Sequence, residues 1–267
     1  MSADNRSQQL PPTRVKSKWP TRFTKALRNR LRILHRNTFA HWHLATSKAR
    51  LHALLRSQDG SAAGLVAVTN DFKGKGWFEA ITGWQEPTEF VSMVEWVQAQ
   101  RPDNVLEIGT AKGATLLAWC RLARTRVISV DLPGGIHGGG YPAIKQALYQ
   151  QFLVDRPGVT LHCLQKNSHL EATRDWAKAI LREDELDILY IDGDHTYAGV
   201  KADFELWSPL VRPGGHVIFH DILPHKFVTD CEVNRLWAEL KLRYVWKEIV
   251  ADPRQGWAGI GIITLPA

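Results

Sequence analysis

The second half of the chain alternates short apolar runs with longer segments whose apolar residues recur every three or four positions. Five runs are rich enough in Val, Ile and Leu for strands buried on both faces, near residues 104–108, 126–131, 159–163, 187–192 and 215–220. The segments between them have helical periodicity. This alternation predicts a doubly wound α/β fold around a parallel sheet.

The C-terminal segment departs from this rhythm. Residues 244–265 contain two strand-like runs joined through Asp252 and Pro253, a connection too short for a helix. Consecutive strands with a short connection pair antiparallel. We therefore expect a Rossmann-like, seven-stranded mixed sheet of the α/β class that ends in an antiparallel hairpin.

Charge separates the N-terminal segment from the rest. Residues 1–56 contain thirteen Lys and Arg against one acid, Asp4, so they carry +12, whereas the whole chain carries +7 and the remainder therefore −5. Residues 1–20 are polar and contain prolines, which is typical of disorder. The sequence predicts a disordered basic tail (1–20), a basic helical extension (21–70) and a catalytic domain (71–267).

The extension predicts a basic amphipathic helix within residues 21–56. Phe23, Leu27, Leu31 and Leu34 recur at helical spacing, and arginines occupy most other positions. Such a helix binds an anionic membrane surface, packs on its own domain or on a second copy in a homo-oligomer, or contacts nucleic-acid phosphates.

The expected location is the cytoplasm, with peripheral attachment to the inner face of the membrane as one interpretation. No segment reaches the roughly 20 apolar residues of a spanning helix, and no apolar signal-peptide core follows the basic start. Cys120, Cys163 and Cys231 are too scattered for a disulfide framework or a zinc knuckle. We expect them to be buried free thiols.

Carboxylates and imidazoles follow two of the predicted strands. Asp192, Asp194 and His195 follow the fourth strand, and His220 and Asp221 end the fifth. Enzymes of this fold class carry their chemistry at the carboxyl ends of strands, and a core does not accept such groups unpaired. The pattern predicts an active site able to hold a metal ion, and a hydrogen-bonded loop network is the alternative.

A glycine-containing turn follows the first strand, in VLEIGTAKGAT at residues 105–115. Gly109 and Gly113 would let a cofactor approach the backbone at a helix N-terminus. Asp131, at the end of the next strand, can accept hydrogen bonds from ribose hydroxyls. The motif E-x-G-x-x-x-G, starting at Glu107, differs from the G-x-G-x-x-G of nicotinamide dinucleotide sites.

Four segments occur in a familiar order: EIGTAKG, VDLP, DILYIDGDH and LVRPGGHVIFHD. In these the sequence resembles class I S-adenosylmethionine-dependent methyltransferases, and most of all the subgroup of cephalosporin-hydroxylase-like proteins and metal-dependent macrolide sugar O-methyltransferases. The resemblance spans about residues 85–264 and leaves out the basic N-terminus. It implies methyl transfer from S-adenosylmethionine to a hydroxyl of a sugar, a glycan or a glycosylated small molecule.

The resemblance also implies roles for the cofactor-binding residues. The methionine moiety would lie in the turn, the ribose on Asp131, and the adenine near the residues that follow the third strand. The implied set is Glu107, Gly109, Thr110, Gly113, Asp131, Asn167, Ser168 and Asp192. Ala111 stands where many relatives have glycine, and we expect little cost because a methyl group is small.

By the same resemblance, Asp192, His220 and Asp221 would bind a divalent cation, Mg²⁺ first and Mn²⁺ second. A cation held by carboxylates lowers the pKa of a substrate hydroxyl and orients it. His220 replaces the usual acid, and an imidazole ligand favours manganese, iron or zinc. His195 occupies the position of the general base beside Asp192, and Asp194 would orient it or bind the metal.

Two other classes of function remain open. A nucleic-acid methyltransferase would use the basic tail on phosphates, but the chain has no N-P-P-Y-type tetrapeptide and no cysteine in the fourth-strand motif. A non-haem iron oxygenase would use Asp192, His195 and His220, and a non-catalytic module would use none of them. The intact turn and Asp131 argue against both. Gln85 and Glu89 are further site candidates.

Overall fold

The computed structural model describes residues 21–134 and 140–267, with side chains from residue 26 onward. The predicted disordered tail, residues 1–20, lies outside the described residues. Contacts divide the chain into two units, Met1–Phe39 and Ala40–Ala267. The boundary thus moves from the predicted residue 70 to Phe39, because helices α2 (Ala40–Ser57) and α3 (Ala62–Asp71) pack within the larger unit.

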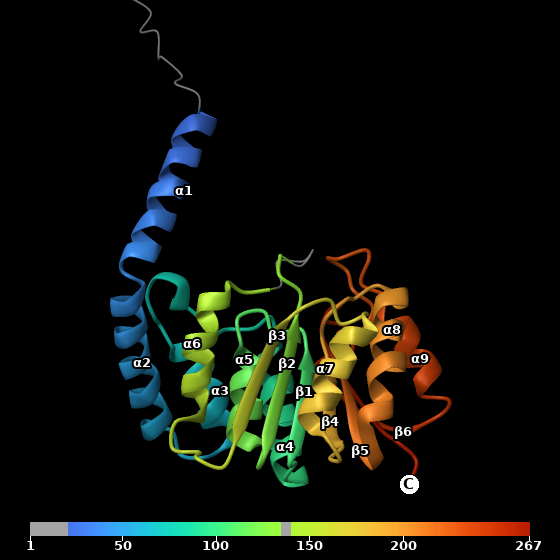
Figure 1. Cartoon of the computed structure of the whole chain (residues 1–267). Coiled ribbons are helices and arrows are strands. Elements are labelled where there is room, and N and C mark those ends of the chain that lie inside the picture. Colours follow the sequence, from blue (N-terminus) through green and yellow to red (C-terminus); the bar gives the residue numbers. More distant parts are fainter. Residues whose placement is uncertain (1–20, 135–139) are drawn as a thin grey trace, which may run out of the picture. The chain divides into compact units, whose positions relative to one another are not determined.

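The larger unit is built on one seven-stranded sheet with the order β3-β2-β1-β4-β5-β7-β6 (Figure 1). Its strands are β1 (Asn104–Ile108), β2 (Arg126–Asp131), β3 (Thr160–Gln165), β4 (Leu186–Ile191), β5 (Val211–His220), β6 (Val245–Ile249) and β7 (Ile260–Thr264). The first five are parallel, and β7 runs antiparallel to both β5 and β6. The predicted mixed sheet with its terminal hairpin is confirmed.

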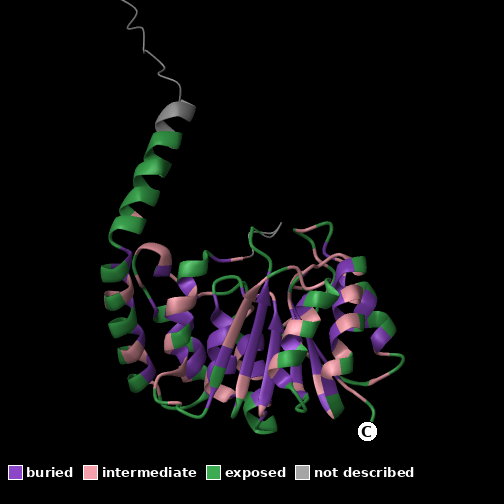
Figure 2. Cartoon of the chain, viewed as in Figure 1, coloured by how far each residue is buried: buried purple, intermediate pink, exposed green. Residues whose placement is uncertain are grey.

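Helices cover both faces of the sheet. One face packs against α2, α3, α4 (Pro87–Gln100), α5 (Ala114–Leu122) and α6 (Gln146–Tyr149), and the other packs against α7 (Glu171–Leu181), α8 (Tyr197–Trp207) and α9 (Val233–Leu240). Val105 of β1 faces the first layer and Leu106 the second, as the two-residue period of a strand requires. Both sides of the central strands are therefore buried (Figure 2).

The strand order reverses next to β1, which lies between β2 and β4. In open parallel sheets, ligands bind at the carboxyl edge beside such a reversal. There the connections that follow the two neighbouring strands run to opposite faces of the sheet and leave a crevice between them. The turn after β1, Asp131 at the end of β2 and Asp192 directly after β4 all lie at this edge. The fold thus brings the predicted site residues to one place.

Helix α1 (Thr21–Thr38) belongs to the smaller unit. Leu27, Leu31 and Leu34 are 52%, 57% and 62% exposed, and among the described side chains of α1 only Arg36 is even half-buried. The predicted helix is confirmed, and its leucines are exposed. Across the residues that the structure describes, no helix is both long enough and apolar enough to cross a membrane.

Candidate active site

The turn after β1 needs glycine at two positions. Gly109 has φ +90°, and a Cβ there would lie 1.9 Å from the carbonyl oxygen of Asp192. Gly113 has φ +91°, and its Cβ would lie 2.7 Å from the Tyr149 ring. The first glycine therefore lets β1 and β4 approach closely at their carboxyl ends, and the second starts α5 against Tyr149.

Ala111 carries a backbone cost that its size alone does not indicate. It has φ +46°, in the left-handed region where an L-residue costs about 1 kcal/mol. Its amide donates to Asp131 Oδ2 at 2.7 Å, and its carbonyl oxygen accepts from the Tyr149 hydroxyl at 3.2 Å. These two hydrogen bonds stabilise the left-handed conformation of Ala111. The sequence-based expectation of little cost took account of the size of the methyl group and not of this backbone conformation.

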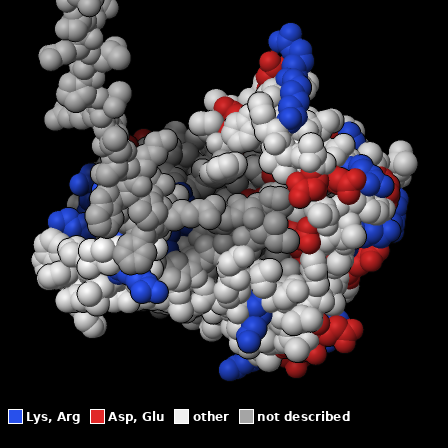
Figure 3. All heavy atoms as spheres, turned by 90° about the horizontal axis from the view of Figure 1, so that it is seen from above, with Lys and Arg blue, Asp and Glu red and all other residues white. Residues whose placement is uncertain are grey.

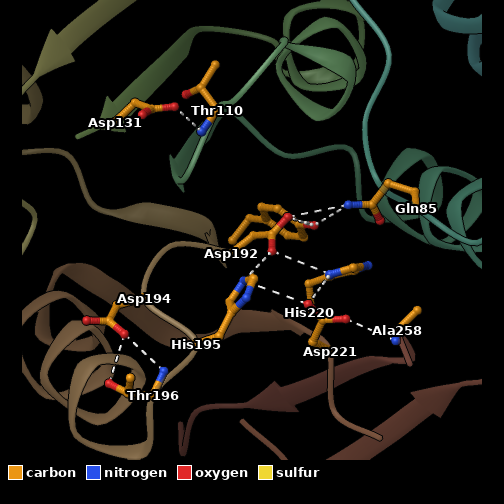
Figure 4. A network of polar contacts seen from close by, with 11 residues as sticks. Gln85, Thr110, Asp131, Asp192, Asp194, His195, Thr196, His220, Asp221 and Ala258 are labelled. Atoms are coloured by element: carbon orange, nitrogen blue, oxygen red, sulfur yellow. Dashed lines mark hydrogen bonds and ion pairs between the residues drawn. The ribbon is translucent and has the colours of Figure 1, made fainter. Parts of the chain in front are cut away.

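Asp131 closes the turn from the end of β2. Its Oδ2 accepts hydrogen bonds from the backbone N–H groups of Thr110 and Ala111, both at 2.7 Å. Figure 4 shows the bond from Thr110. Burial raises the pKa of Asp131, while the two amides act in the opposite direction. The carboxylate is thus fixed beside the turn, where the sequence predicted a ribose contact.

Glu107 lies at the base of the turn and is fully buried. Thr115 Oγ1 donates to Glu107 Oε2 at 2.9 Å, whereas Oε1 has no hydrogen-bond partner within the described part of the chain. Burial raises the pKa of Glu107 to about 8. Its unsatisfied oxygen can accept one further hydrogen bond from a donor in the turn.

Asn167 and Ser168 follow β3 at the same edge of the sheet. Asn167 Oδ1 accepts from the His169 backbone N–H at 2.9 Å, and the Ser168 carbonyl oxygen accepts from Trp207 Nε1 at 2.9 Å. Both bonds fix the loop between β3 and α7. The predicted adenine contact remains a prediction.

Four side chains from the loop after β4, the end of β5 and the loop after β5 form a ring in which carboxylates and imidazoles alternate (Figure 4). Asp192 Oδ1 lies 3.2 Å from His195 Nε2 and 3.4 Å from His220 Nδ1. Asp221 Oδ2 lies 3.3 Å from His220 Nδ1 and 3.7 Å from His195 Nε2. The four predicted catalytic and metal-binding residues are therefore together.

The two kinds of side chain shift each other's pKa. Burial opposes the charge on His220, but Asp192 and Asp221 overcome it and raise the pKa of His220 well above its usual value. The pKa of His195 is raised against burial by the same carboxylates. Burial likewise opposes charge on Asp192 and Asp221, but the imidazoles lower both pKa values. The carboxylates thus favour the protonated imidazoles, and the imidazoles favour the ionised carboxylates.

Asp221 reaches the ring from a strained backbone. It has φ +62°, and its Oδ1 accepts from the Ala258 N–H at 3.0 Å. Ala258 is held in turn by buried Glu89 of α4, which accepts from the Gly259 N–H at 2.8 Å and the Ala251 N–H at 2.9 Å. Glu89, a further site candidate in the sequence, thus positions the connection between β6 and β7 and does not join the ring.

Gln85 and Tyr190 contact the far oxygen of Asp192. The Tyr190 hydroxyl donates to Asp192 Oδ2 at 3.2 Å, and Gln85 Nε2 donates to the same oxygen at 3.4 Å. Gln85 was a candidate from the sequence, whereas Tyr190 was missed. The two-residue period of a strand could have revealed it, because side chains two positions apart, such as those of Tyr190 and Asp192, point to the same face of the sheet.

Asp194 does not join the ring, contrary to the prediction. Its Oδ1 accepts from the Thr196 N–H at 2.9 Å and from the Thr196 hydroxyl at 2.8 Å (Figure 4). It therefore stabilises the turn before α8, as aspartates commonly do two residues ahead of an N–H donor. Cys231, missed as a site residue, lies buried beside His195 and Asp221.

Comparison with known proteins finds similarity over parts of the chain. Residues 106–222 match a family model described as "Methyltransferase domain". A Sinorhizobium fredii protein named "Uncharacterized protein y4gI" is 31% identical over 153 residues, which cover 54% of this chain and 16% of that protein. The chain thus corresponds to a small part of this curated relative.

One solved structure agrees in fold over most of this chain, and a second is less similar. An O-methyltransferase from Bacillus cereus, in complex with S-adenosylhomocysteine, has a TM-score of 0.50 and 19% identity, over 81% of this chain and 90% of its own. The O-methyltransferase TomG from Streptomyces achromogenes, in complex with S-adenosylmethionine, has a TM-score of 0.47 and 15% identity, over 66% and 78%. At such identities the likeness concerns the fold alone.

Residues 106–222 thus resemble a methyltransferase domain, and the larger unit shares the fold of a solved O-methyltransferase. Both findings agree with the predicted fold class.

Proposed function

We propose that this protein transfers the methyl group of S-adenosylmethionine to a hydroxyl of a sugar, a glycan or a glycosylated small molecule, with help from a divalent cation. The observation that carries the proposal is the position of the alternating ring at the carboxyl edge that also holds the glycine turn. Asp192 links the two, because its carbonyl oxygen packs on Gly109 and its carboxylate enters the ring.

The turn and the strand ends would bind the cofactor. Gly109, Thr110 and Gly113 leave backbone room for the methionine moiety, and the unsatisfied Oε1 of Glu107 suits its amino group. Asp131 would hold the ribose from the end of β2, and Asn167 and Ser168 would lie near the adenine. Asp192 would lie beside the sulfonium, between cofactor and ring.

The ring residues fit a divalent cation. Ligand atoms of Asp192, His220 and Asp221 lie within 4.8 Å of one another. Buried His220 faces both carboxylates with Nδ1, and its Nε2 has no hydrogen-bond partner among the described residues. Two carboxylates suit Mg²⁺, and the imidazole extends the choice to Mn²⁺. When bound, the cation would lower the pKa of the acceptor hydroxyl and orient it.

His195 would take the proton from the acceptor hydroxyl. Its Nε2 lies between Asp192 Oδ1 and Asp221 Oδ2, so a proton on this nitrogen is stabilised by both carboxylates. Proton transfer to His195 would form an imidazolium, and the two carboxylates would stabilise its positive charge. Asp192 would also orient the imidazole toward the reacting oxygen.

The surface near the ring supports a sugar as the acceptor. Trp84 is 84% exposed and precedes Gln85, which contacts Asp192. An exposed indole can stack on the apolar face of a sugar ring. The charged side chains seen on this face are of both signs and lie mainly along its margin (Figure 3), whereas nucleic-acid grooves are usually basic.

Cofactor binding is the first test. Asp131→Ala is expected to raise the Kd for S-adenosylmethionine about ten- to hundredfold, the equivalent of a lost hydrogen bond to a charged group. Titration calorimetry of the full chain measures it, and Asp175→Ala, an exposed acid on α7, is the matched control. Equal affinity of Asp131→Ala and the unmodified protein would contradict the ribose assignment.

A second candidate, an iron-dependent oxygenase, is favoured by one observation. His195 Nε2 and His220 Nδ1 lie 3.2 Å and 3.4 Å from Asp192 Oδ1. These three residues supply the two histidines and one carboxylate of a facial triad. The same titration separates the candidates. Absence of S-adenosylmethionine binding, with Fe²⁺-dependent oxygen consumption, would support the oxygenase.

For helix α1 we propose an anionic membrane surface as the partner. Leu27, Leu31 and Leu34 form an exposed apolar row at helical spacing. Arg28, Arg30 and Arg32 lie among them, also exposed, and residues 21–58 contain no acid. Arginines near an anionic surface contribute roughly 1 kcal/mol each, and each buried leucine about 1.5–3 kcal/mol.

Vesicle sedimentation tests this partner. The full chain is expected to pellet with vesicles containing phosphatidylglycerol but not with phosphatidylcholine alone. Replacing Leu27, Leu31 and Leu34 with glutamine, which keeps helix propensity and charge, should lower the bound fraction more than about tenfold. Asn29→Gln on the same helix is the control. Undiminished binding of the triple variant would exclude docking through the apolar row.

A further inference from the structure

Cys231 lies beside the alternating ring without belonging to it. Ligand atoms of His195, Asp221 and Cys231 lie within 4.8 Å of one another, as do those of Asp192, His220 and Asp221. The two groups share Asp221 and differ in chemistry. The group with Asp192 and His220 consists of two carboxylates and an imidazole. The group with Cys231 consists of one carboxylate, one imidazole and a thiol.

The chain holds Cys231 in this place through its neighbours. The Glu232 N–H donates to the carbonyl oxygen of His195 at 2.7 Å, and the Tyr197 N–H donates to Glu232 Oε2 at 3.3 Å. The loop before α9 is thereby tied to the loop after β4. Cys231 is 7% exposed, so its thiol position follows from this fixed backbone and from the packing around α9.

Most buried cysteines only fill space, and Cys231 does pack in the apolar core under α8 and α9. Two features distinguish it. An imidazole and a carboxylate converge on its thiol, and the adjoining His220 is buried with its Nδ1 3.3 Å from Asp221 Oδ2, the carboxylate that the two groups share. Cys120 and Cys163 belong to no such group in the described part of the chain.

Donor chemistry decides which cation each group prefers. Mg²⁺ binds oxygen ligands and does not select sulfur, whereas Zn²⁺ and Co²⁺ bind thiolate, imidazole and carboxylate together. Three protein ligands with a remaining open position are typical of zinc sites that also bind a small molecule. The group with Cys231 therefore suits a softer ion than the group with Asp192.

We propose that His195, Asp221 and Cys231 form a second cation subsite, which binds Zn²⁺ or a similar thiophilic ion beside the harder Asp192, His220 and Asp221 group. An ion in this subsite occupies His195 and Asp221, and therefore withdraws both from the hydroxyl chemistry proposed above. Only this consequence rests on the proposed function. Cation binding itself can be measured without cofactor or acceptor.

Cobalt titration of the chelator-treated full chain tests the subsite. Co²⁺ bound to a thiolate gives a sulfur-to-metal charge-transfer absorption in the near ultraviolet, which oxygen and nitrogen ligands do not give. We expect this absorption in the unmodified protein, its displacement by Zn²⁺, and its loss in Cys231→Ser and Cys231→Ala. Cys120→Ser and Cys163→Ser are the matched controls and should keep it.

Affinity gives an independent measurement. Cys231→Ser should weaken Zn²⁺ binding by at least about tenfold, since even outer partners of metal ligands contribute that much, and should leave Mn²⁺ binding unchanged. Absence of the absorption from the unmodified protein, or its persistence in both Cys231 variants, would overturn the proposal. Failure of S-adenosylmethionine to bind would overturn the proposed function and leave the cobalt result intact.

Discussion

Asp192→Asn is expected to lower Mn²⁺ affinity about a hundredfold and to reduce methyl transfer by roughly 10³. One oxygen of Asp192 contacts both imidazoles of the ring, and the other accepts from Tyr190 and Gln85. Asparagine keeps the shape but removes the charge that a cation and a protonated His195 need.

The neighbouring acid provides the control for this variant. Asp194 lies two residues away, but it accepts hydrogen bonds only from Thr196, and an asparagine oxygen can accept the same bonds. Asp194→Asn should therefore bind Mn²⁺ like the unmodified protein. Calorimetric titration of both variants with Mn²⁺, with circular dichroism to verify folding, makes the comparison. A similar loss in both variants would mean that the effect comes from the loop and not from the ring.

Gly109→Ala is expected to destabilise the fold by roughly 3 kcal/mol or more, because two costs combine. The left-handed backbone costs an alanine about 1–2 kcal/mol, and the new Cβ would lie 1.9 Å from the Asp192 carbonyl oxygen. Backbone of β4 would have to move away from β1. The free energy of unfolding from urea titration measures the effect.

Gly60→Ala separates the two costs. Gly60 has φ +81°, and a Cβ there meets nothing within 4 Å. This variant should lose only the conformational part, about 1–2 kcal/mol. The difference between the two variants then gives the cost of the close approach between strands. Equal losses would show that the turn relaxes without disturbing the site.

The sequence predicted those parts of the molecule that follow a regular pattern. β1 and β2 begin and end at the predicted residues, because their apolar runs stop abruptly at polar ones. The same rule identified Asp131 and Asp192. Strand β5 starts at Val211, earlier than predicted, because Pro213 and two glycines interrupt the apolar run while the chain stays extended with a shift in register.

The failures come from interactions that no periodicity reveals. Helix α2 buries His43, Ser47, Leu51 and Leu55 at four-residue spacing, and the two polar members obscured its core-facing side. Asp194 accepts hydrogen bonds from Thr196 in the local turn and therefore does not enter the ring. Cys231 lies in a loop, where the sequence has no regular pattern of hydrophobic positions. Its thiol lies near the ring because the Glu232 N–H donates to the carbonyl oxygen of His195.

The left-handed backbone of Asp221 bears on how such a site persists through evolution. An aspartate with φ +62° costs about 1 kcal/mol relative to glycine in backbone conformation, but its Oδ1 accepts a hydrogen bond from the buried Ala258 N–H. Asparagine keeps this bond and tolerates the left-handed backbone, so selection for folding alone would accept it as readily as aspartate. Drift toward asparagine at this position is therefore expected in any descendant that has lost the chemistry. An aspartate retained here would identify the lineages in which the ring still works.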